Sequence, residues 1–95
     1  MNLRFEWDAN KANDNITKHG VSFEEAVTVF QDVTAVIFDD ENHSDKELRE
    51  IIVGYSDRNR LLLVCFTERN DAIRIINARK ATRREHQDYE KHYSY

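Results

Sequence analysis

The sequence predicts an α+β fold in which helices pack on one face of a mainly antiparallel sheet of four to five strands. Three observations lead to this fold class. A stretch with strand periodicity opens the chain, and two helix-initiation signals follow within the first 30 residues. Four segments rich in β-branched and aromatic residues then alternate with turn-forming residues, and a third helix signal follows them. Ninety-five residues suffice for one hydrophobic core, so we expect a single domain over residues 1–95.

The first two elements are a strand and a helix. Residues 3–7 alternate between apolar and charged side chains, which is typical of a strand with one buried face. Asp8 is a favourable N-cap for a helix that runs to Lys18, although several asparagines lower its intrinsic propensity. Gly20 then favours a helix end in the left-handed conformation.

A second helix is predicted to begin at Ser22, which forms a capping box with Glu25. Val21 precedes this cap and is placed to pack on Ala26 as a hydrophobic staple. The apolar residues recur at i, i+3, i+4 and i+7, so one helix face should point to the core: Phe23, Ala26, Val27 and Phe30.

Four strands are expected in the middle of the chain. Their connections are short and rich in turn-forming residues, apart from an acidic loop, so an antiparallel meander is predicted. The strands are expected over residues 34–39, 48–55, 60–67 and 72–79, with the acidic loop over residues 39–45.

A last helix is predicted from the capping box of Thr82 and Glu85 to about Tyr93. It is mostly polar, and Tyr89 and Tyr93 are its main apolar positions. We therefore expect it to lie on the surface or to dock on something outside the domain.

The composition excludes several classes of protein. The chain has no proline, two glycines and one cysteine, which is incompatible with collagen-like, low-complexity and disulfide-scaffold sequences. Hydrophobic residues make up 40% and charged residues 34%, as in a soluble globular domain. Its apolar runs are too short for a membrane span, and no secretory signal opens the sequence. A cytoplasmic protein without a membrane partner is expected.

The charge is unevenly distributed along the chain. The net charge of −4 argues against a nucleic-acid partner, but residues 1–50 carry five Lys/Arg against twelve Asp/Glu. Residues 51–95 carry nine Lys/Arg against six Asp/Glu. A basic segment of this kind can bind phosphates despite an acidic total. Its bases, with Asp71 as the one acid between them, are Arg69, Arg74, Arg79, Lys80, Arg83 and Arg84.

Three arginines on the expected strands are candidates for an anion site: Arg49, Arg74 and Arg79. The guanidinium group is always charged and its fork geometry suits phosphate. Several on one face could stabilise a pentavalent phosphorane. The alternative is that each arginine forms a structural ion pair with an acid such as Glu47, Glu50 or Asp71. Strict alternation places Asn77 and Arg79 on one face of the strand and Arg74 on the other.

Acid–base candidates flank the second predicted strand. His43 and Glu47 lie close together in sequence before Arg49, and environment can move both pKa values toward neutrality. The alternative is an exposed loop histidine beside a solvated glutamate. Lys18 and His19 complement a helix dipole or contact substrate.

Metal and thiol chemistry are not expected. No Cys pair or zinc motif is present, and the four histidines are scattered along the sequence. Cys65 lies in an apolar run and is expected to be a small buried hydrophobe.

The chain resembles the BrnT family of toxins from bacterial type II toxin–antitoxin operons. The resemblance extends over nearly the whole sequence, in order and with natural spacing. The segments that carry it are Phe5-Glu6-Trp7-Asp8, Lys11, Asn15, residues 18–26, Asp39 or Asp40, His43, Glu47, Arg49, Gly54-Tyr55-Ser56, Thr67-Glu68-Arg69 and residues 74–85.

The resemblance implies a RelE-like fold and a ribonuclease that needs neither metal nor cofactor and arrests translation. It also implies neutralisation by a ribbon–helix–helix antitoxin, through which alone operator DNA is contacted. In such enzymes the ribose 2′-OH attacks the adjacent phosphate, so the substrate is RNA. The residue patterns and the resemblance together favour as catalytic residues His43, Glu47, Arg49, Arg74 and Arg79. Lys18 and His19 are the second choice for acid–base work, and the expected RNA-phosphate contacts are Lys18, His19, Arg69, Lys80 and Arg83.

Two segments depart from the family pattern. Asn77 stands where the family usually has serine, and residues 86–88 replace a more basic stretch. The second departure weakens an RNA-binding role for the last helix. The alternative function is a non-catalytic binding module that acts as a co-repressor with its antitoxin.

Overall fold

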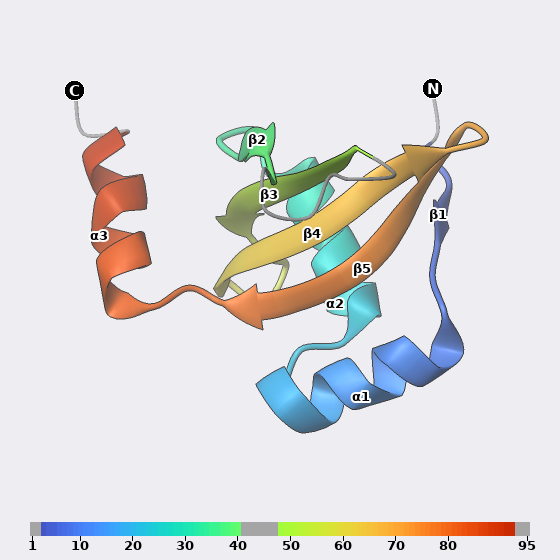
Figure 1. Cartoon of the computed structure of the whole chain (residues 1–95). Coiled ribbons are helices and arrows are strands. Elements are labelled where there is room, and N and C mark those ends of the chain that lie inside the picture. Colours follow the sequence, from blue (N-terminus) through green and yellow to red (C-terminus); the bar gives the residue numbers. More distant parts are fainter. Residues whose placement is uncertain (1–2, 41–47, 93–95) are drawn as a thin grey trace.

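A computed structural model describes residues 3–40 and 48–92 of the chain. The described part contains a five-stranded sheet and three α-helices (Figure 1). The strand order is β1-β5-β4-β3-β2. The elements are β1 (Phe5–Glu6), α1 (Ala9–His19), α2 (Phe23–Thr28), the 3₁₀ turn η1 (Val29–Gln31), β2 (Val36–Asp39), β3 (Arg49–Tyr55), β4 (Leu61–Arg69), β5 (Ala72–Lys80) and α3 (Arg83–His92).

The sheet is mixed. Strands β2 to β5 form the predicted antiparallel meander, and β1 adds to the far edge by pairing parallel to β5, with Phe5 opposite Ile73. The parallel strand is short, because the alternating stretch at residues 3–7 yields only two paired residues. The α+β class is confirmed, with a sheet of five strands that is mixed because β1 pairs parallel to β5.

The helix termini form where the sequence predicts them. The Asp8 carboxylate accepts hydrogen bonds from the backbone N–H groups of Asn10 and Lys11, at 2.8 and 3.1 Å. Gly20 ends α1 with φ of 68°, a conformation that favours glycine. Ser22 Oγ accepts from the Glu25 backbone N–H at 3.0 Å and begins α2.

Helices α1 and α2 cover one side of the sheet, which we call the core face. Val21, Phe23 and Ala26 are fully buried there against alternate residues of the central strands. Asn15 clamps α1 to β5: its amide donates to the carbonyl of Ala78 at 2.7 Å and accepts from the Ala78 N–H at 3.1 Å. An asparagine that weakens the helix by propensity therefore holds it to the sheet. The core residues of β3, β4 and β5 are Ile52, Leu62, Val64, Phe66, Ile75 and Ala78.

Close approach to the core face needs a glycine at position 54. A Cβ on Gly54 would lie 2.8 Å from Ala35 Cβ and 3.0 Å from Asp32 Oδ2. Asp32 in turn accepts a hydrogen bond from the Tyr55 N–H at 2.7 Å. The segment between η1 and β2 thus packs directly on the backbone of β3.

A buried carboxylate joins α2 to the β3–β4 turn. Glu25 is 5% exposed and forms an ion pair with Arg60, and it accepts a hydrogen bond from Ser56 Oγ at 2.7 Å. Arg60 also donates to the carbonyl of Gly20 at 3.1 Å, so it reaches the end of α1. The sequence pattern identified Glu25 only as part of a capping box.

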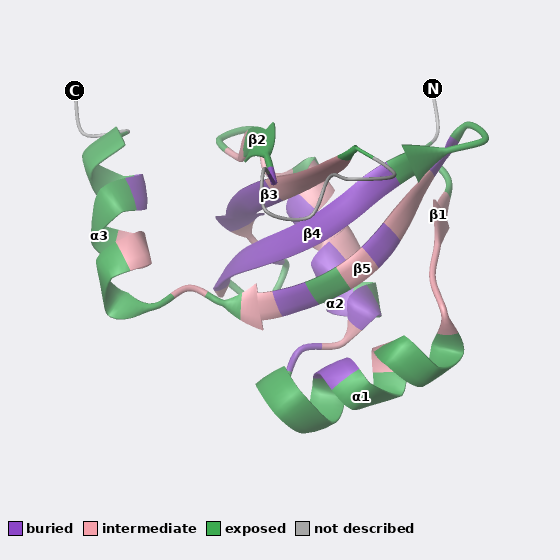
Figure 2. Cartoon of the chain, in the orientation of Figure 1, coloured by how far each residue is buried: buried purple, intermediate pink, exposed green. Residues whose placement is uncertain are grey.

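Helix α3 packs on the opposite side of the sheet from α1 and α2. Figures 1 and 2 show it set apart from these helices, beyond the end of β5. Tyr89 is buried with Val53, Leu61 and Leu63, which alternate with the core-face residues of the same strands. Its hydroxyl donates to the carbonyl of Thr34 at 2.8 Å. The prediction that all the helices pack on one face of the sheet is therefore wrong. Tyr89, the buried residue of α3, packs on the face opposite to α1 and α2.

Of the two expectations for the last helix, the surface position is confirmed, because Tyr89 is the one buried residue of α3. Tyr89 packs on the domain's own sheet. Tyr93, the other predicted apolar position, lies outside the described residues.

Candidate functional site

A β-bulge in β5 decides which residues face the open side of the sheet. Cys65 pairs with Asn77 and Phe66 pairs with Ile75, so Ile76 is an extra residue without a partner in the register. Both Ile75 and Ala78 point into the core, at 1% and 0% exposure. Strict alternation would have placed them on opposite faces.

The bulge corrects the predicted placement of Arg74. Since directly paired residues project from the same side of a sheet, Arg74 pairs with Thr67 on the side that carries Asn77 and Arg79. The prediction that Arg74 lies on the other face is wrong, because one inserted residue reverses the alternation before it.

Three rows of cross-strand partners make up this side of the sheet, which we call the arginine face. Consecutive rows are two residues apart, about 7 Å, so Arg74 and Arg79 are separated by about 13 Å along β5. The three candidate arginines lie here, two in the first row and one in the third, and Arg69, which pairs with Ala72, lies one row beyond the first. The rows are Arg49–Thr67–Arg74, Ile51–Cys65–Asn77 and Val53–Leu63–Arg79.

Arg79 is held by the first turn of α3. Its two terminal nitrogens donate to both carboxylate oxygens of Glu85, at 2.7 and 2.8 Å. This paired hydrogen bond lowers the pKa of the Glu85 carboxyl to about 2 and raises that of the guanidinium. Glu85 also accepts from the Thr82 N–H, while its own N–H donates to Thr82 Oγ1, so the predicted capping box is confirmed.

Arg74 and Arg49 make the first row of the face. Arg74 pairs with Glu6 of β1 at 3.1 Å, and its side chain is 32% exposed. Arg49 is half-buried at the start of β3. Between them Thr67 donates its hydroxyl to the carbonyl of Leu48 at 2.7 Å. The ion-pair alternative therefore holds for Arg74 and Arg79, although their partners are not the acids that the sequence suggested.

A cavity of about 220 Å³ opens between the rows. Its floor is the side chains of Ile51, Leu63 and Cys65, and its polar lining is Asp40, Asn77 and Arg79. Cys65 is buried, as predicted, and its Sγ lies 3.7 Å from Asp40 Oδ2. The site thus combines cations, a buried carboxylate and an apolar floor.

A second cavity of about 250 Å³ lies under α3, between Tyr89 and the edge of the sheet at Phe38. Aromatic groups gather beside it: the rings of Tyr55 and His86 are 6.1 Å apart, and their polar atoms are 3.5 Å apart. The His86 ring also contacts Glu90 at 2.7 Å. This end of the arginine face is covered in part by α3, whereas the end at Arg74 is not.

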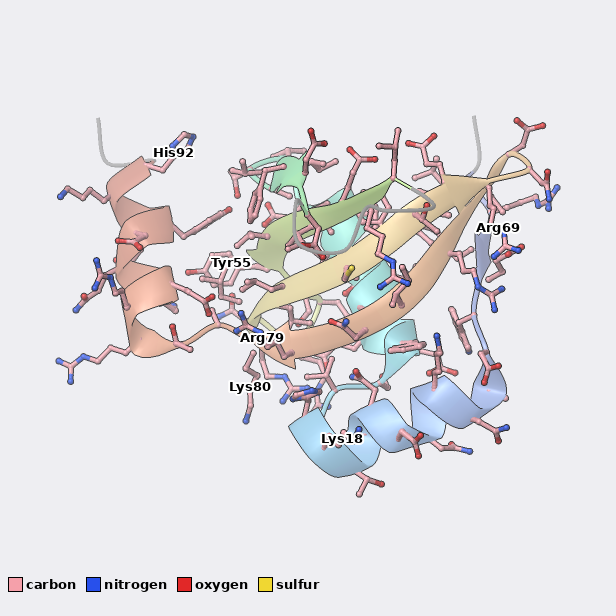
Figure 3. All side chains as sticks on the ribbon, viewed as in Figure 1. Lys18, Tyr55, Arg69, Arg79, Lys80 and His92 are labelled. Carbon is pink, nitrogen blue, oxygen red and sulfur yellow. The ribbon has the colours of Figure 1, made fainter. Side chains whose placement is uncertain are left out.

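The other predicted phosphate contacts are dispersed (Figure 3). Lys18 and His19 are exposed at the end of α1, on the core-face side. Lys80 pairs with Leu62 and so projects to the core-face side as well. Arg69 lies at the β4–β5 hairpin, far along the sheet from Arg79 (Figure 3).

Arg83 is exposed at the start of α3. His43 and Glu47 lie outside the described residues. The basic segment of the sequence is therefore divided between two faces and two ends of the sheet.

Sequence reasoning missed several members of the site. Glu6 and Glu85 are the partners of Arg74 and Arg79, and Asp40 lines the cavity. No spacing rule connects residue 6 to residue 74, since a parallel strand pairing brings them together. Glu85 was recognisable from the sequence as a capping residue. Its second partner, Arg79, comes within reach only through the turn between β5 and α3.

Within residues 3–40 and 48–92, no three metal-binding side chains come together in a cluster. In the same part of the chain, no helix has the length and apolarity needed to cross a membrane.

Comparisons with known proteins match this architecture. A family described as "Ribonuclease toxin, BrnT, of type II toxin-antitoxin system" matches residues 7–85. A crystal structure of the Brucella abortus ribonuclease toxin BrnT superposes with a TM-score of 0.67, at 22% sequence identity, covering 86% of this chain and 100% of that one. No curated protein sequence matches the chain. Because the family profile spans most of the sequence, the chain belongs to the BrnT family of ribonuclease toxins from type II toxin–antitoxin systems.

Proposed function

We propose that the arginine face is the RNA-cleaving surface of a metal-independent endoribonuclease that inhibits translation. The observation that supports this most directly is the convergence of Arg49, Arg74 and Arg79 on one face through the bulge in β5. Convergent guanidinium groups bind the phosphate backbone and stabilise the charge that develops at phosphorus in the transition state.

In the proposed reaction the ribose 2′-oxygen attacks the adjacent phosphorus. The bond from phosphorus to the 5′-oxygen then breaks, which leaves a 2′,3′-cyclic phosphate and a 5′-hydroxyl. Arg49 and Arg74 hold the non-bridging oxygens in this proposal, because they flank Thr67 in one row. His43 and Glu47 remain the proposed acid–base pair, since they lie six and two positions before Arg49 in the sequence.

The ion pairs of the site are compatible with phosphate binding. Arg79 offers five N–H donors, of which Glu85 takes one from each terminal nitrogen, so donors remain for substrate. The Arg79 side chain is also 38% exposed. In this proposal Glu85 and Glu6 orient the guanidinium groups in the free protein.

Lys18, His19, Lys80 and Arg83 lie away from the first row, and Arg69 lies one row beyond it. These five residues are proposed to attract the RNA backbone more generally. Such exposed cations raise the rate of encounter without selecting a cleavage site.

A toxin of this class has an antitoxin partner. We propose that this antitoxin is of the ribbon–helix–helix type and that operator DNA is contacted through it. A RelE-like relationship and a cytoplasmic location belong to the same proposal. An inhibitor must block access to the arginine face. We expect the double change of Arg74 and Arg79 to alanine to weaken the toxin–antitoxin complex at low salt.

The proposal is tested with purified protein and RNA in EDTA. The expected products carry 2′,3′-cyclic phosphate and 5′-hydroxyl ends, and a 2′-deoxy substitution at the cut position blocks the reaction. Arg74→Ala should lower the cleavage rate at least tenfold. Arg58→Ala removes an exposed arginine near Glu25 on the core-face side and serves as the matched control.

Glu6→Gln separates the two roles of Arg74. It removes the ion pair but keeps the arginine, so it should lower stability slightly and retain cleavage. Intact RNA with the wild-type protein would instead support the non-catalytic co-repressor function. Equal losses in Arg74→Ala and Glu6→Gln would assign Arg74 to a structural ion pair.

A further inference from the structure

We infer that the cavity between the arginine rows receives one nucleobase of the RNA and that Asp40 selects guanine there. This inference rests on the proposed ribonuclease function and adds a substrate specificity to it. The cavity, at about 220 Å³, is smaller than the roughly 300–1,000 Å³ that is usual for drug-sized ligands. It suits a single planar ring system better than a larger group.

The lining of the cavity has the chemistry of a base pocket. Ile51, Leu63 and Cys65 form an apolar floor on which a ring can lie, and Asn77 is exposed at the opening. Single-stranded RNA is read in this way, with a base unstacked, packed on a side-chain surface and hydrogen-bonded along its edge.

Asp40 supplies the acceptors of the pocket. The residue is 9% exposed, and its backbone N–H donates to the carbonyl of Arg49 at 2.9 Å, which places it at the end of β2. The Cys65 thiol, 3.7 Å from Oδ2, is a weak donor. An ionised carboxylate has about four acceptor positions and no donor, so it favours a ligand edge that presents donors.

Guanine is the base whose edge fits these acceptors. Its N1–H and its 2-amino group are adjacent donors that one carboxylate can accept together. Adenine and cytosine each place a ring-nitrogen acceptor beside their amino group, and uracil places one N–H between two carbonyls. A buried carboxylate facing any of these would meet an acceptor, which is unfavourable. Asn77 or Arg79 can donate to the guanine O6.

The position of the pocket relates the base to the cleaved bond. The row of Cys65 and Asn77 lies about 7 Å from the row of Arg49 and Arg74. A phosphate held by the first row therefore belongs to the selected nucleotide or to its neighbour. Guanine should accordingly be preferred at one fixed position next to the cut.

The experiment compares wild type, Asp40→Asn and Asp39→Asn on a randomised RNA, with the 5′-hydroxyl ends of the products sequenced. Asp39 is the matched control, since it is adjacent, exposed and paired with Glu50, so its side chain points to the other face. Wild type and Asp39→Asn should prefer guanine by about 10- to 100-fold at one position, and Asp40→Asn should lose this preference. Cleavage without guanine preference, or a preference that survives in folded Asp40→Asn, would overturn the inference.

Base analogues test the same point without a variant, in case Asp40→Asn does not fold. Inosine, which lacks the 2-amino group, should reduce cleavage about tenfold, and 1-methylguanine should abolish it. Cleavage unaffected by both analogues would also overturn the inference.

A binding measurement keeps the two proposals apart. If the wild-type protein cleaves no RNA, the proposed ribonuclease function fails. Titration with GMP and AMP, followed by NMR of the Asn77 side-chain amide, then decides the inference alone. GMP binding at least tenfold tighter than AMP would support it, and equal affinities would refute it.

Discussion

Replacing Glu85 by glutamine should loosen the attachment of α3 to the sheet. The amide is isosteric and can still accept from the Thr82 N–H, so the capping box is kept. The paired, charge-assisted hydrogen bond to Arg79 is lost, because a neutral amide offers one acceptor oxygen in place of two.

The magnitude follows from the pKa of the Glu85 carboxyl. A reduction from 4.5 to about 2 is equivalent to about 3 kcal/mol in favour of the ionised form. The side chains of Arg79 and Glu85 are 38% and 33% exposed, so solvent screens the pair and we expect about 1–2 kcal/mol. For a chain of this size that corresponds to a decrease in Tm of roughly 4–16 °C.

The contribution of Glu85 to the free energy of unfolding should depend on pH. Because the pKa of Glu85 is lowered in the folded protein, its contribution is complete above pH 4.5 and is lost as the pH falls toward 2. Wild type and Glu85→Gln should therefore differ at pH 7 and converge near pH 2.

Urea unfolding followed by circular dichroism, at several pH values, measures this difference. A double-mutant cycle with Arg79→Gln isolates the pair. Equal free energies of unfolding at pH 7, or a constant difference down to pH 2, would refute the reasoning.

Three further outcomes are expected. Gly54→Ala should lower the free energy of unfolding by about 1–3 kcal/mol, because the added Cβ would overlap the segment packed before β2. Gly20→Ala, whose Cβ meets no neighbouring atom, should lower it by about 1 kcal/mol through backbone strain alone. Urea unfolding measures both differences. Glu25→Gln should cost about 2–3 kcal/mol at pH 7, because Arg60 loses its buried partner, and less below pH 4 since the pKa of Glu25 is lowered; a pH-independent difference would contradict this. Cys65 is 6% exposed at the floor of the cavity, so it should react with a small thiol reagent more slowly in the native than in the unfolded protein, and equal rates would contradict its burial.

The elements that depend on neighbouring residues were predictable from the sequence. Helix starts at Asp8, Ser22 and Thr82 are specified by side chains that bond to backbone groups two or three positions away. The stop at Gly20 is equally local, because it depends on the conformation of one residue. Strands β2 to β5 also appear close to their expected bounds.

Features that depend on distant pairings were not predictable in this way. The bulge at Ile76 is a property of the register between two strands, and nothing in the residue itself distinguishes it from Ile75. The side on which α3 packs depends on Tyr89 meeting the carbonyl of Thr34, 55 positions away.

The candidate site was predicted in part. The arginines were identified by their type and by their place on strands, and the structure brings Arg49, Arg74 and Arg79 to one face. Their partners Glu6 and Glu85 could be identified only from the folded structure. Glu6 reaches Arg74 from the neighbouring strand β1, and Glu85 reaches Arg79 across the turn between β5 and α3.

The bulge at Ile76 has a consequence for how this family can vary. Substitutions along β5 change single side chains, but loss of one residue between Arg74 and Asn77 would exchange the buried and exposed sets of the strand's first half. The number of residues between Arg74 and Arg79 should therefore be invariant among functional relatives even where their identities differ. An alignment of such relatives should contain no gap in this interval, and natural insertions should instead occur in the turns at either end of the strand.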